Sequence, residues 1–245
     1  MTSIVRPKSN LPIWITVASL LSLLAPLLRS VRPVVAREFL LKYSIRFNKY
    51  EYRVDLPSQC PSLTDLLRSA AEVSNTMHDV DYARYQGEWQ SFATNDATIP
   101  SGGICQCDRF TWTYNERGRS FQSRLDIRCN HLGTFQMDLY GQTNVTGIPG
   151  TIYEGSPNFG ADLIPGYVLW VDGETYNSSV RYFCKEDYLG VPVFSSLQIW
   201  TRKTIQRNSD EGRRLLDIAH RVLPISFDEM YLEFADHTDC GDLSR

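Results

Sequence analysis

Six cysteines and four histidines are the side chains most able to bind a metal or act as nucleophiles. Cys105-Gln-Cys107 could supply two metal ligands or a redox pair, but the chain has no Cys-x-x-Cys, no His-Glu-x-x-His and no Gly-x-Ser-x-Gly. The histidines stand far apart, at His78, His131, His220 and His237. Asp108 and Asp126 could form a carboxylate pair, although a solvated or ion-paired surface explains them more simply. We therefore expect no catalytic residue, no metal and no cofactor.

The first 36 residues predict export. Arg6 and Lys8 precede an uncharged run over residues 11–28, and Val34-Val35-Ala36 offers small residues for cleavage. A run of this length is also near the lower limit of a membrane span, so a retained anchor is the alternative. In an exported chain the six cysteines favour three disulfides over a metal site. We expect a secreted extracellular protein, or a membrane-anchored one that faces the lumen or the outside.

Net charge and two short motifs bear on the partners. The chain has a net charge of −3, and residues 1–36 contain four basic and no acidic side chains, so the remainder carries −7. An acidic domain without a basic patch is not expected to bind nucleic acid. Asn144-Val-Thr146 and Asn177-Ser-Ser179 are acceptor sequences for N-glycosylation in an exported chain. We therefore expect glycans at Asn144 and Asn177 and no nucleic-acid partner.

Strand-like runs dominate the rest of the chain, whose 42% apolar and 12% aromatic residues suffice for a core. Turns rich in Gly, Pro, Asn and Asp separate the runs. Eight runs follow one another, at residues 87–94, 107–114, 120–129, 134–142, 150–154, 167–171, 180–185 and 193–203. Eight consecutive strands with hairpin-length links predict an up-and-down barrel or a sandwich.

Two helices are expected around these strands. Residues 61–73 have helical spacing and a cap at Ser62 or Thr64, after an extended arm over residues 37–59. Residues 208–222 begin at a Ser209 cap and carry an apolar stripe, which predicts a helix packed on the outside of the sheet. Residues 230–235 read as one more short strand before Cys240.

One disulfide can be argued from a hairpin. If the strands at 107–114 and 120–129 fold about Gly118, Cys107 lies opposite Cys129 and Asp108 lies opposite Arg128. The alternative is a one-residue register slip, which would separate the two cysteines.

Two short segments far apart in the sequence define a possible barrel closure. Gly87-Glu-Trp89 enters the first strand run, and Trp200-Thr-Arg202 leaves the last. A Trp and an Arg at these places can stack as a cation–π pair where the first and last strands of a closed barrel meet.

The combination resembles the lipocalins, and the tail from Ser196 to Cys240 is similar to that of the apolipoprotein D-like group. Val171-Asp172-Gly-Glu-Thr-Tyr176 resembles the second motif of the family, with Gly173 in place of its first Tyr. Gln90 and Ser91 stand where that group usually carries Tyr-Glu. The resemblance spans residues 60–240.

The resemblance implies an all-β fold, an eight-stranded up-and-down antiparallel β-barrel with one C-terminal α-helix packed outside. It divides the chain into a signal peptide or anchor (1–36), an N-terminal arm with a short helix (37–80) and the barrel with its helix and tail (81–245). It implies that Gly87, Trp89 and Arg202 close the barrel. It also implies disulfides Cys60–Cys184 and Cys105–Cys240, which leaves Cys107 and Cys129, the pair that the hairpin selects.

A lipocalin-like barrel implies a carrier of one small hydrophobic ligand, such as a sterol, a retinoid, a carotenoid-like pigment or a fatty acid. Strand alternation selects inward candidates for ligand contact, although each could equally be core filling. They are Phe110, Trp112, Tyr114, Met137, Leu139, Tyr167 and Leu169. The alternatives are a lipocalin-like enzyme, an isomerase or de-epoxidase of a lipophilic substrate, and a membrane-anchored protein-binding module. Contact with a membrane or a receptor is a further expectation.

Overall fold

The computed structural model describes residues 45–47, 50–52, 56–96, 105–129, 133–157, 163–228, 232–235, 237 and 240. The chain forms two compact units, Met1–Tyr52 and Arg53–Arg245. In the first unit, β1 (Ile45–Phe47) and β2 (Tyr50–Tyr52) form an antiparallel hairpin. The signal peptide or anchor expected over residues 1–36 lies outside the described residues. Among the helices that the structure does describe, none has both the length and the hydropathy needed to cross a membrane.

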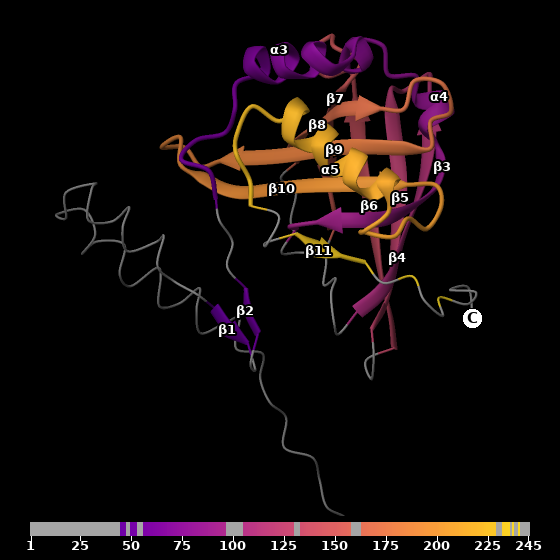
Figure 1. Cartoon of the computed structure of the whole chain (residues 1–245). Helices are drawn as coiled ribbons and strands as arrows, with labels where there is room; N and C mark the ends of the chain where they lie inside the picture. The colour runs from indigo at the N-terminus through magenta and orange to yellow at the C-terminus, as the bar shows by residue number, and fades with distance from the viewer. Residues whose placement is uncertain are drawn as a thin grey trace, which may run out of the picture. The chain divides into compact units, whose positions relative to one another are not determined.

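Eight antiparallel strands of the second unit close into a barrel (Figure 1). Each strand pairs with the next, and the last pairs with the first where Gln198 lies opposite Thr94. The strands are β3 (Gly87–Thr94), β4 (Cys105–Asn115), β5 (Ser120–Cys129), β6 (Gly133–Thr143), β7 (Thr151–Gly155), β8 (Ile164–Val171), β9 (Ser178–Glu186) and β10 (Pro192–Thr201). The short β11 (Glu233–Phe234) adds to β3 beyond the end of its pairing with β4. The expected up-and-down barrel is confirmed, and the sandwich is not formed.

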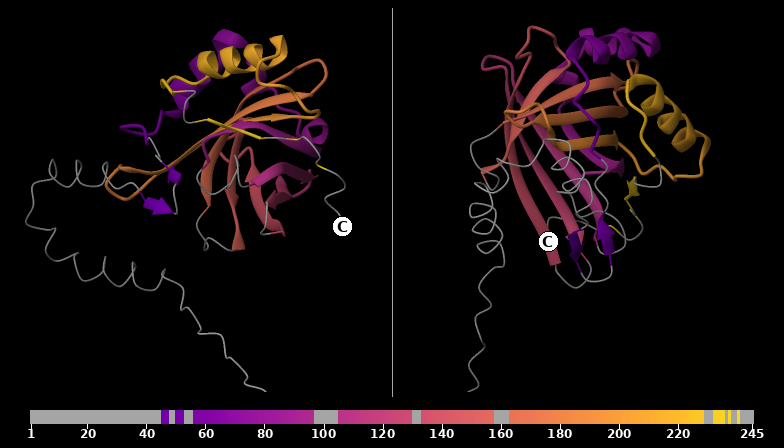
Figure 2. Two further views of the ribbon diagram at one scale, coloured as in Figure 1. Left: turned by 60° about the horizontal axis from the view of Figure 1, so that its bottom comes forward. Right: turned by 90° about the vertical axis from the view of Figure 1, so that its left-hand side faces the viewer.

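Two longer helices lie on the outside of the barrel, side by side in Figure 2. In α3 (Leu63–Val73) the Ser62 side chain accepts a hydrogen bond from the Asp65 N–H, and in α5 (Asp210–Val222) Ser209 caps the Gly212 N–H in the same way. The expected C-terminal helix is thus present. The helix α3, which the sequence assigned to the arm, belongs to the same unit as the barrel, since that unit begins at Arg53.

Two short elements before β3 were not expected from the sequence. They are the 3-10 helix η1 (Asn75–His78) and the single turn α4 (Tyr82–Tyr85). The Asp81 side chain caps α4 by accepting hydrogen bonds from the N–H groups of Ala83 and Arg84. This turn brings two tyrosines to the start of β3.

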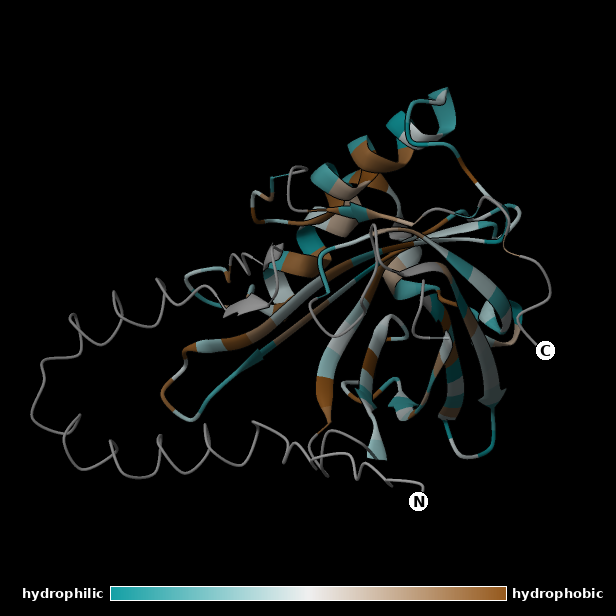
Figure 3. Ribbon diagram, turned by 90° about the horizontal axis from the view of Figure 1, so that it is seen from below, coloured by the Kyte–Doolittle hydropathy of each residue, from teal (hydrophilic) through white to brown (hydrophobic). Residues whose placement is uncertain are grey.

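The buried residues form two separate cores. The helix-facing core joins α3 and α5 to the outer face of the sheet, and includes Leu66, Ala70, Leu169, Tyr182, Leu197, Leu215 and Val222. The barrel-interior core includes Tyr82, Tyr85, Trp89, Phe110, Trp112, Phe121, Leu125, Met137, Val168, Phe183 and Trp200. Figure 3 shows apolar segments alternating with polar ones along several strands. Because both faces of the β9–β10 part of the sheet are covered, its strands are buried almost throughout.

The hairpin β4–β5 contains a β-bulge that corrects the predicted disulfides. Arg109 lies opposite Asp126, but Gln106 lies opposite Arg128 and Cys105 opposite Cys129, so two residues of β4 face Ile127 alone. Cys107, the first of the two, has a φ of 64°. The hairpin also turns between Asn115 and Ser120 rather than symmetrically about Gly118.

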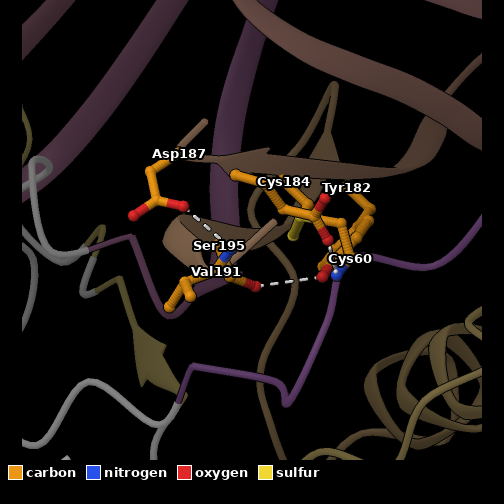
Figure 4. The surroundings of a disulfide bond; sticks show 7 residues. Cys60, Tyr182, Cys184, Asp187, Val191 and Ser195 are labelled. Carbon is orange, nitrogen blue, oxygen red and sulfur yellow. Dashed lines mark hydrogen bonds between the residues drawn. A yellow bond between two sulfur atoms is a disulfide. The ribbon is translucent and has the colours of Figure 1, made fainter. Parts of the chain in front are cut away.

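Cys107 therefore bonds Cys240, and both predicted pairings of these cysteines, Cys107–Cys129 and Cys105–Cys240, are wrong. Arg128 does not face Asp108 for the same reason. The register instead predicts a bridge between Cys105 and Cys129. The other bridge, Cys60–Cys184, is present and ties the lead-in to β9 (Figure 4).

Candidate ligand site in the barrel

One end of the barrel is closed by Arg202 and Trp89. The Arg202 guanidinium carbon lies 3.8 Å from the centroid of the Trp89 ring. The same guanidinium donates to the carbonyl oxygens of Glu88 (2.7 Å), Gln86 (2.8 Å) and Tyr85 (2.9 Å). It thus satisfies carbonyls at the end of α4 while it stacks on the ring.

Gly87 admits this arrangement. Its φ is +103°, and a Cβ built there would lie 3.0 Å from Arg202 Nη1. A side chain at this position would therefore be strained and would push the guanidinium away. The structure thus places the three expected closure residues, Gly87, Trp89 and Arg202, together.

Aromatic rings fill the barrel above this closure. The Trp112 ring stacks on Phe121, with centroids 3.9 Å apart, and meets Tyr85 edge-on at 5.3 Å. Tyr82 lies parallel to Trp112 at 6.2 Å, and Tyr85 lies 4.7 Å from Trp89. Offset and edge-to-face contacts of this kind stabilise an aromatic cluster beyond its buried area. The base of the barrel is therefore a packed floor.

Five of the seven candidate ligand residues belong to the barrel-interior core. Phe110, Trp112 and Met137 are buried there, and Tyr114 and Leu139 are partly buried against the same core. Tyr167 and Leu169 belong to the helix-facing core on the outer face of the sheet, so the prediction that they face the ligand is wrong. Alternation correctly put both on one face of β8, but it cannot say which face the helices cover.

A buried ion pair inside the barrel was missed by the sequence reasoning. Arg181 of β9, with a side chain 1% exposed, donates from Nη2 to Glu154 of β7 at 3.0 Å. Its guanidinium also lies over the rings of Phe183 (4.8 Å), Trp112 (5.3 Å) and Phe110 (5.4 Å). Burial raises the pKa of Glu154, while the charge and hydrogen bond of Arg181 oppose this. A charge inside the apolar run of β9 is a signal in the sequence, but its partner lies 27 residues away.

A second polar group lies where β10 meets β3. The Asp96 carboxylate accepts hydrogen bonds from Ser196 Oγ and Gln198 Nε2, both at 2.9 Å. The Gln198 side-chain oxygen in turn accepts from Trp200 Nε1 at 3.0 Å. This network links a buried carboxylate to the aromatic core through neutral donors.

Asp108 is the most unusual carboxyl of the barrel. It is the second residue of the β4 bulge and is fully buried, and neither of its oxygens has a hydrogen-bond partner in the described part of the chain. Burial, and secondarily the charge of Glu233 on β11, raise its pKa from 3.8 to about 7. Asp126 is not its partner, because it faces Arg124 and Gln136 on the outer side of β5.

Several solved structures share the barrel fold of this chain at low sequence identity. Lobster apocrustacyanin A1 superposes with a TM-score of 0.53 at 19% identity, over 74% of this chain and 89% of that one. H1 crustacyanin from the lobster Homarus americanus gives a TM-score of 0.51 at 19% identity, over 74% and 88%. Insecticyanin from the tobacco hornworm Manduca sexta gives 0.52 at 14% identity, over 67% and 84%.

Neither the known protein-family models nor the curated proteins contain a match to the sequence. Similarity at these identities is therefore evidence for the fold alone. The closed antiparallel barrel, its outer C-terminal helix and these superpositions agree, and the chain has the lipocalin fold.

Proposed function

We propose that this chain is a lipocalin of the apolipoprotein D-like group that carries one small hydrophobic ligand outside the cell. The observation that carries the proposal is the barrel-interior core, in which aromatic and aliphatic side chains of all eight barrel strands face one another above a sealed base. Barrels of this size hold one small ligand in the interior. The disulfide from Cys60 to Cys184 supports the subgroup because it is the pairing that the resemblance implies, whereas the tail bridge joins Cys240 to Cys107 and not to Cys105.

Phe110, Trp112, Met137, Tyr114 and Leu139 are the proposed ligand contacts. Their rings and methyl groups suit a sterol, a retinoid, a carotenoid-like pigment or a fatty acyl chain. Burial of such a ligand releases roughly 25 cal/mol per Å² of apolar surface, ample for micromolar affinity.

Native mass spectrometry of the protein purified from a eukaryotic secretory host, followed by lipid extraction, tests the proposal. The expected result is a bound lipophile at one per chain, or saturable binding of a retinoid, a sterol or a fatty acyl probe. The carrier is excluded if no lipophile is recovered and none of the three probes binds. The same mass spectrum reports glycans at Asn144 and Asn177 through the shift on enzymatic deglycosylation, and N-terminal sequencing distinguishes a start near Arg37 from a retained anchor.

An enzyme acting on a lipophilic substrate is the second candidate, and Asp108 is the observation that favours it. A buried carboxyl whose pKa is about 7 can take up and release a proton near neutral pH. Extended incubation of the bound lipophile with the protein distinguishes the two functions. An enzyme yields an isomerised product, or a de-epoxidised one when a two-electron reductant is added to the incubation, and this product is lost in Asp108→Asn, whereas a carrier returns the lipophile unchanged.

Contact with a membrane surface is the further partner that we propose, through the tip of the β9–β10 hairpin. Tyr188 is 94% exposed and Leu189 69% exposed, and residues 188–194 carry no charge. Asp187 fixes the turn by accepting hydrogen bonds from the N–H groups of Leu189 (2.8 Å) and Val191 (2.9 Å), the latter shown in Figure 4. Figure 3 shows apolar residues at this protruding end. Flotation with phosphatidylcholine vesicles should be lost in Leu189→Asp, and equal flotation of both proteins would exclude this surface.

A further inference from the structure

Four buried polar groups without a partner gather at one tryptophan of the barrel interior, and the indole N–H of that tryptophan is one of them. Within the described residues, the Tyr82 hydroxyl, Trp112 Nε1, Ser123 Oγ and Arg181 Nε have no hydrogen-bond partner. Each of these side chains is at most 5% exposed. A buried polar group left unpaired loses its hydration without compensation, so four such groups in one place call for an explanation.

These four groups come from separate segments but meet at the Trp112 ring. Tyr82 of α4 stacks on it at 6.2 Å, and the Arg181 guanidinium of β9 lies 5.3 Å from its centroid. Ser123 of β5 is the residue directly opposite Trp112 in the β4–β5 register. Burial raises the pKa of Tyr82, and the charge of Arg181 opposes the shift, so the hydroxyl lies within electrostatic reach of the guanidinium.

The chemistry of the four groups determines what would satisfy them. Trp112 Nε1 and Arg181 Nε can only donate, whereas the hydroxyls of Tyr82 and Ser123 can donate or accept. The missing partner is therefore a hydrogen-bond acceptor, and an oxygen atom with two lone pairs serves two donors at once.

The charges nearby determine that this acceptor is neutral. The positive charge of Arg181 is already matched by Glu154 at 3.0 Å. The charge of Asp96 also acts to raise the pKa of Glu154, so a second carboxylate lies within electrostatic reach of this ion pair. A carboxylate brought to this place would be a buried charge with no free counter-ion, which is costly.

We propose that the base of the barrel binds an uncharged oxygen, a hydroxyl or carbonyl, of an otherwise apolar ligand, and discriminates against the corresponding carboxylate. This inference rests on the proposed carrier function and narrows its ligand class to lipophilic alcohols, ketones and esters. The rings of Phe121, Trp112 and Tyr82 stack on one another, so we infer that a ligand oxygen reaches the four groups when a ring of this stack shifts. Binding therefore changes tryptophan fluorescence.

Two matched pairs of probes, retinol with retinoate and hexadecanol with hexadecanoate, test the proposal at pH 7.5. Quenching of tryptophan fluorescence gives the affinity for the retinoids, and displacement of retinol gives it for the C16 pair. The alcohol of each pair should bind at least about tenfold more tightly than the acid. Tyr82→Phe and Ser123→Ala should each weaken retinol binding about fivefold, the loss of one hydrogen bond of about 1 kcal/mol.

Tyr182→Phe is the matched control, because its hydroxyl bonds Ser195 at 3.1 Å in the helix-facing core. It should leave the affinity for all probes unchanged, and thermal melting verifies that every variant is folded. Equal or tighter binding of the acids, or retinol affinity unchanged in both Tyr82→Phe and Ser123→Ala, overturns the inference while the carrier function stands. Failure of the four probes, a sterol and β-carotene to bind overturns the carrier function and the inference with it.

Discussion

Asp108→Asn should stabilise the protein at high pH and have little effect at low pH. The folded state raises the pKa of Asp108 from 3.8 to about 7, since the carboxyl is fully buried without a partner among the described residues. Below pH 4 the carboxyl is protonated in both the folded and the unfolded chain, so its ionisation costs no stability. Between pH 4 and 7 the unfolded chain loses the proton first, and stability falls as pH rises.

The size of this effect follows from the two pKa values. Each unit of difference is worth about 1.4 kcal/mol, so a carboxyl at about 7 in the folded state costs about 4 kcal/mol of stability above pH 7. The neutral amide of asparagine has no such cost. The free energy of unfolding of Asp108→Asn minus that of the original protein should therefore rise by about 4 kcal/mol between pH 4 and pH 8.

Urea unfolding followed by tryptophan fluorescence, with the disulfides intact, measures this difference at half-unit steps of pH. Asp138→Asn is the control, because the Asp138 side chain is 77% exposed and the substitution therefore removes an exposed charge, not a buried one. A difference between Asp108→Asn and the original protein that stays constant from pH 4 to pH 8 would refute the argument from burial.

Three further predictions concern the residues that hold the barrel together. Arg202→Lys should lower the free energy of unfolding by about 2–4 kcal/mol, because an ammonium cannot stack on Trp89 and donate to several carbonyls at once. Arg213→Lys is the control, since the Arg213 side chain is exposed, and equal stability of the two variants would contradict the prediction. Non-reducing peptide mapping should link Cys107 to Cys240, Cys60 to Cys184 and Cys105 to Cys129, and a peptide joining Cys107 to Cys129 would show the register to be wrong. Glu154→Gln should cost about 3–5 kcal/mol in urea unfolding because it strands the buried Arg181 charge, whereas Arg181→Met combined with Glu154→Leu should recover most of that loss; a single variant as stable as the original protein would exclude a buried ion pair.

The strand pattern was predictable because local rules determine it. The bounds of β3 and β5 coincide with the predicted runs, since alternation and flanking turn residues mark both ends. The longer helices were marked by their serine caps and apolar stripes. The single turn α4 has no period to detect, and the only local signal was Asp81, a capping residue one position before it.

The interior of the barrel was predictable only in part, because it depends on register and on which face is covered. Arg181 and Glu154 lie on different strands that are not neighbours in the sheet, and no spacing in the sequence relates them. The donors around Trp112 come from four segments and become a group only when the barrel closes. Leu169 shows the complementary error, because alternation gives its face of β8 correctly, but the packing of α3 and α5 decides whether that face lies inside or outside the barrel.

The β4 bulge accounts for both the disulfide error and the missed carboxyl. The bulge adds one residue to β4 opposite Ile127. As a result Cys107 forms a disulfide with Cys240 of the C-terminal tail, and Asp108 is buried near Glu233. The bridge holds the same tail that carries Glu233 on β11, and the burial and charge of that neighbourhood raise the pKa of Asp108.

Loosening the tail should therefore hydrate Asp108 and return its pKa toward 3.8. In a Cys240→Ser background the pH-dependent gain of Asp108→Asn should shrink well below about 4 kcal/mol. An undiminished gain there would show that β4 and its bulge bury the carboxyl without the tail.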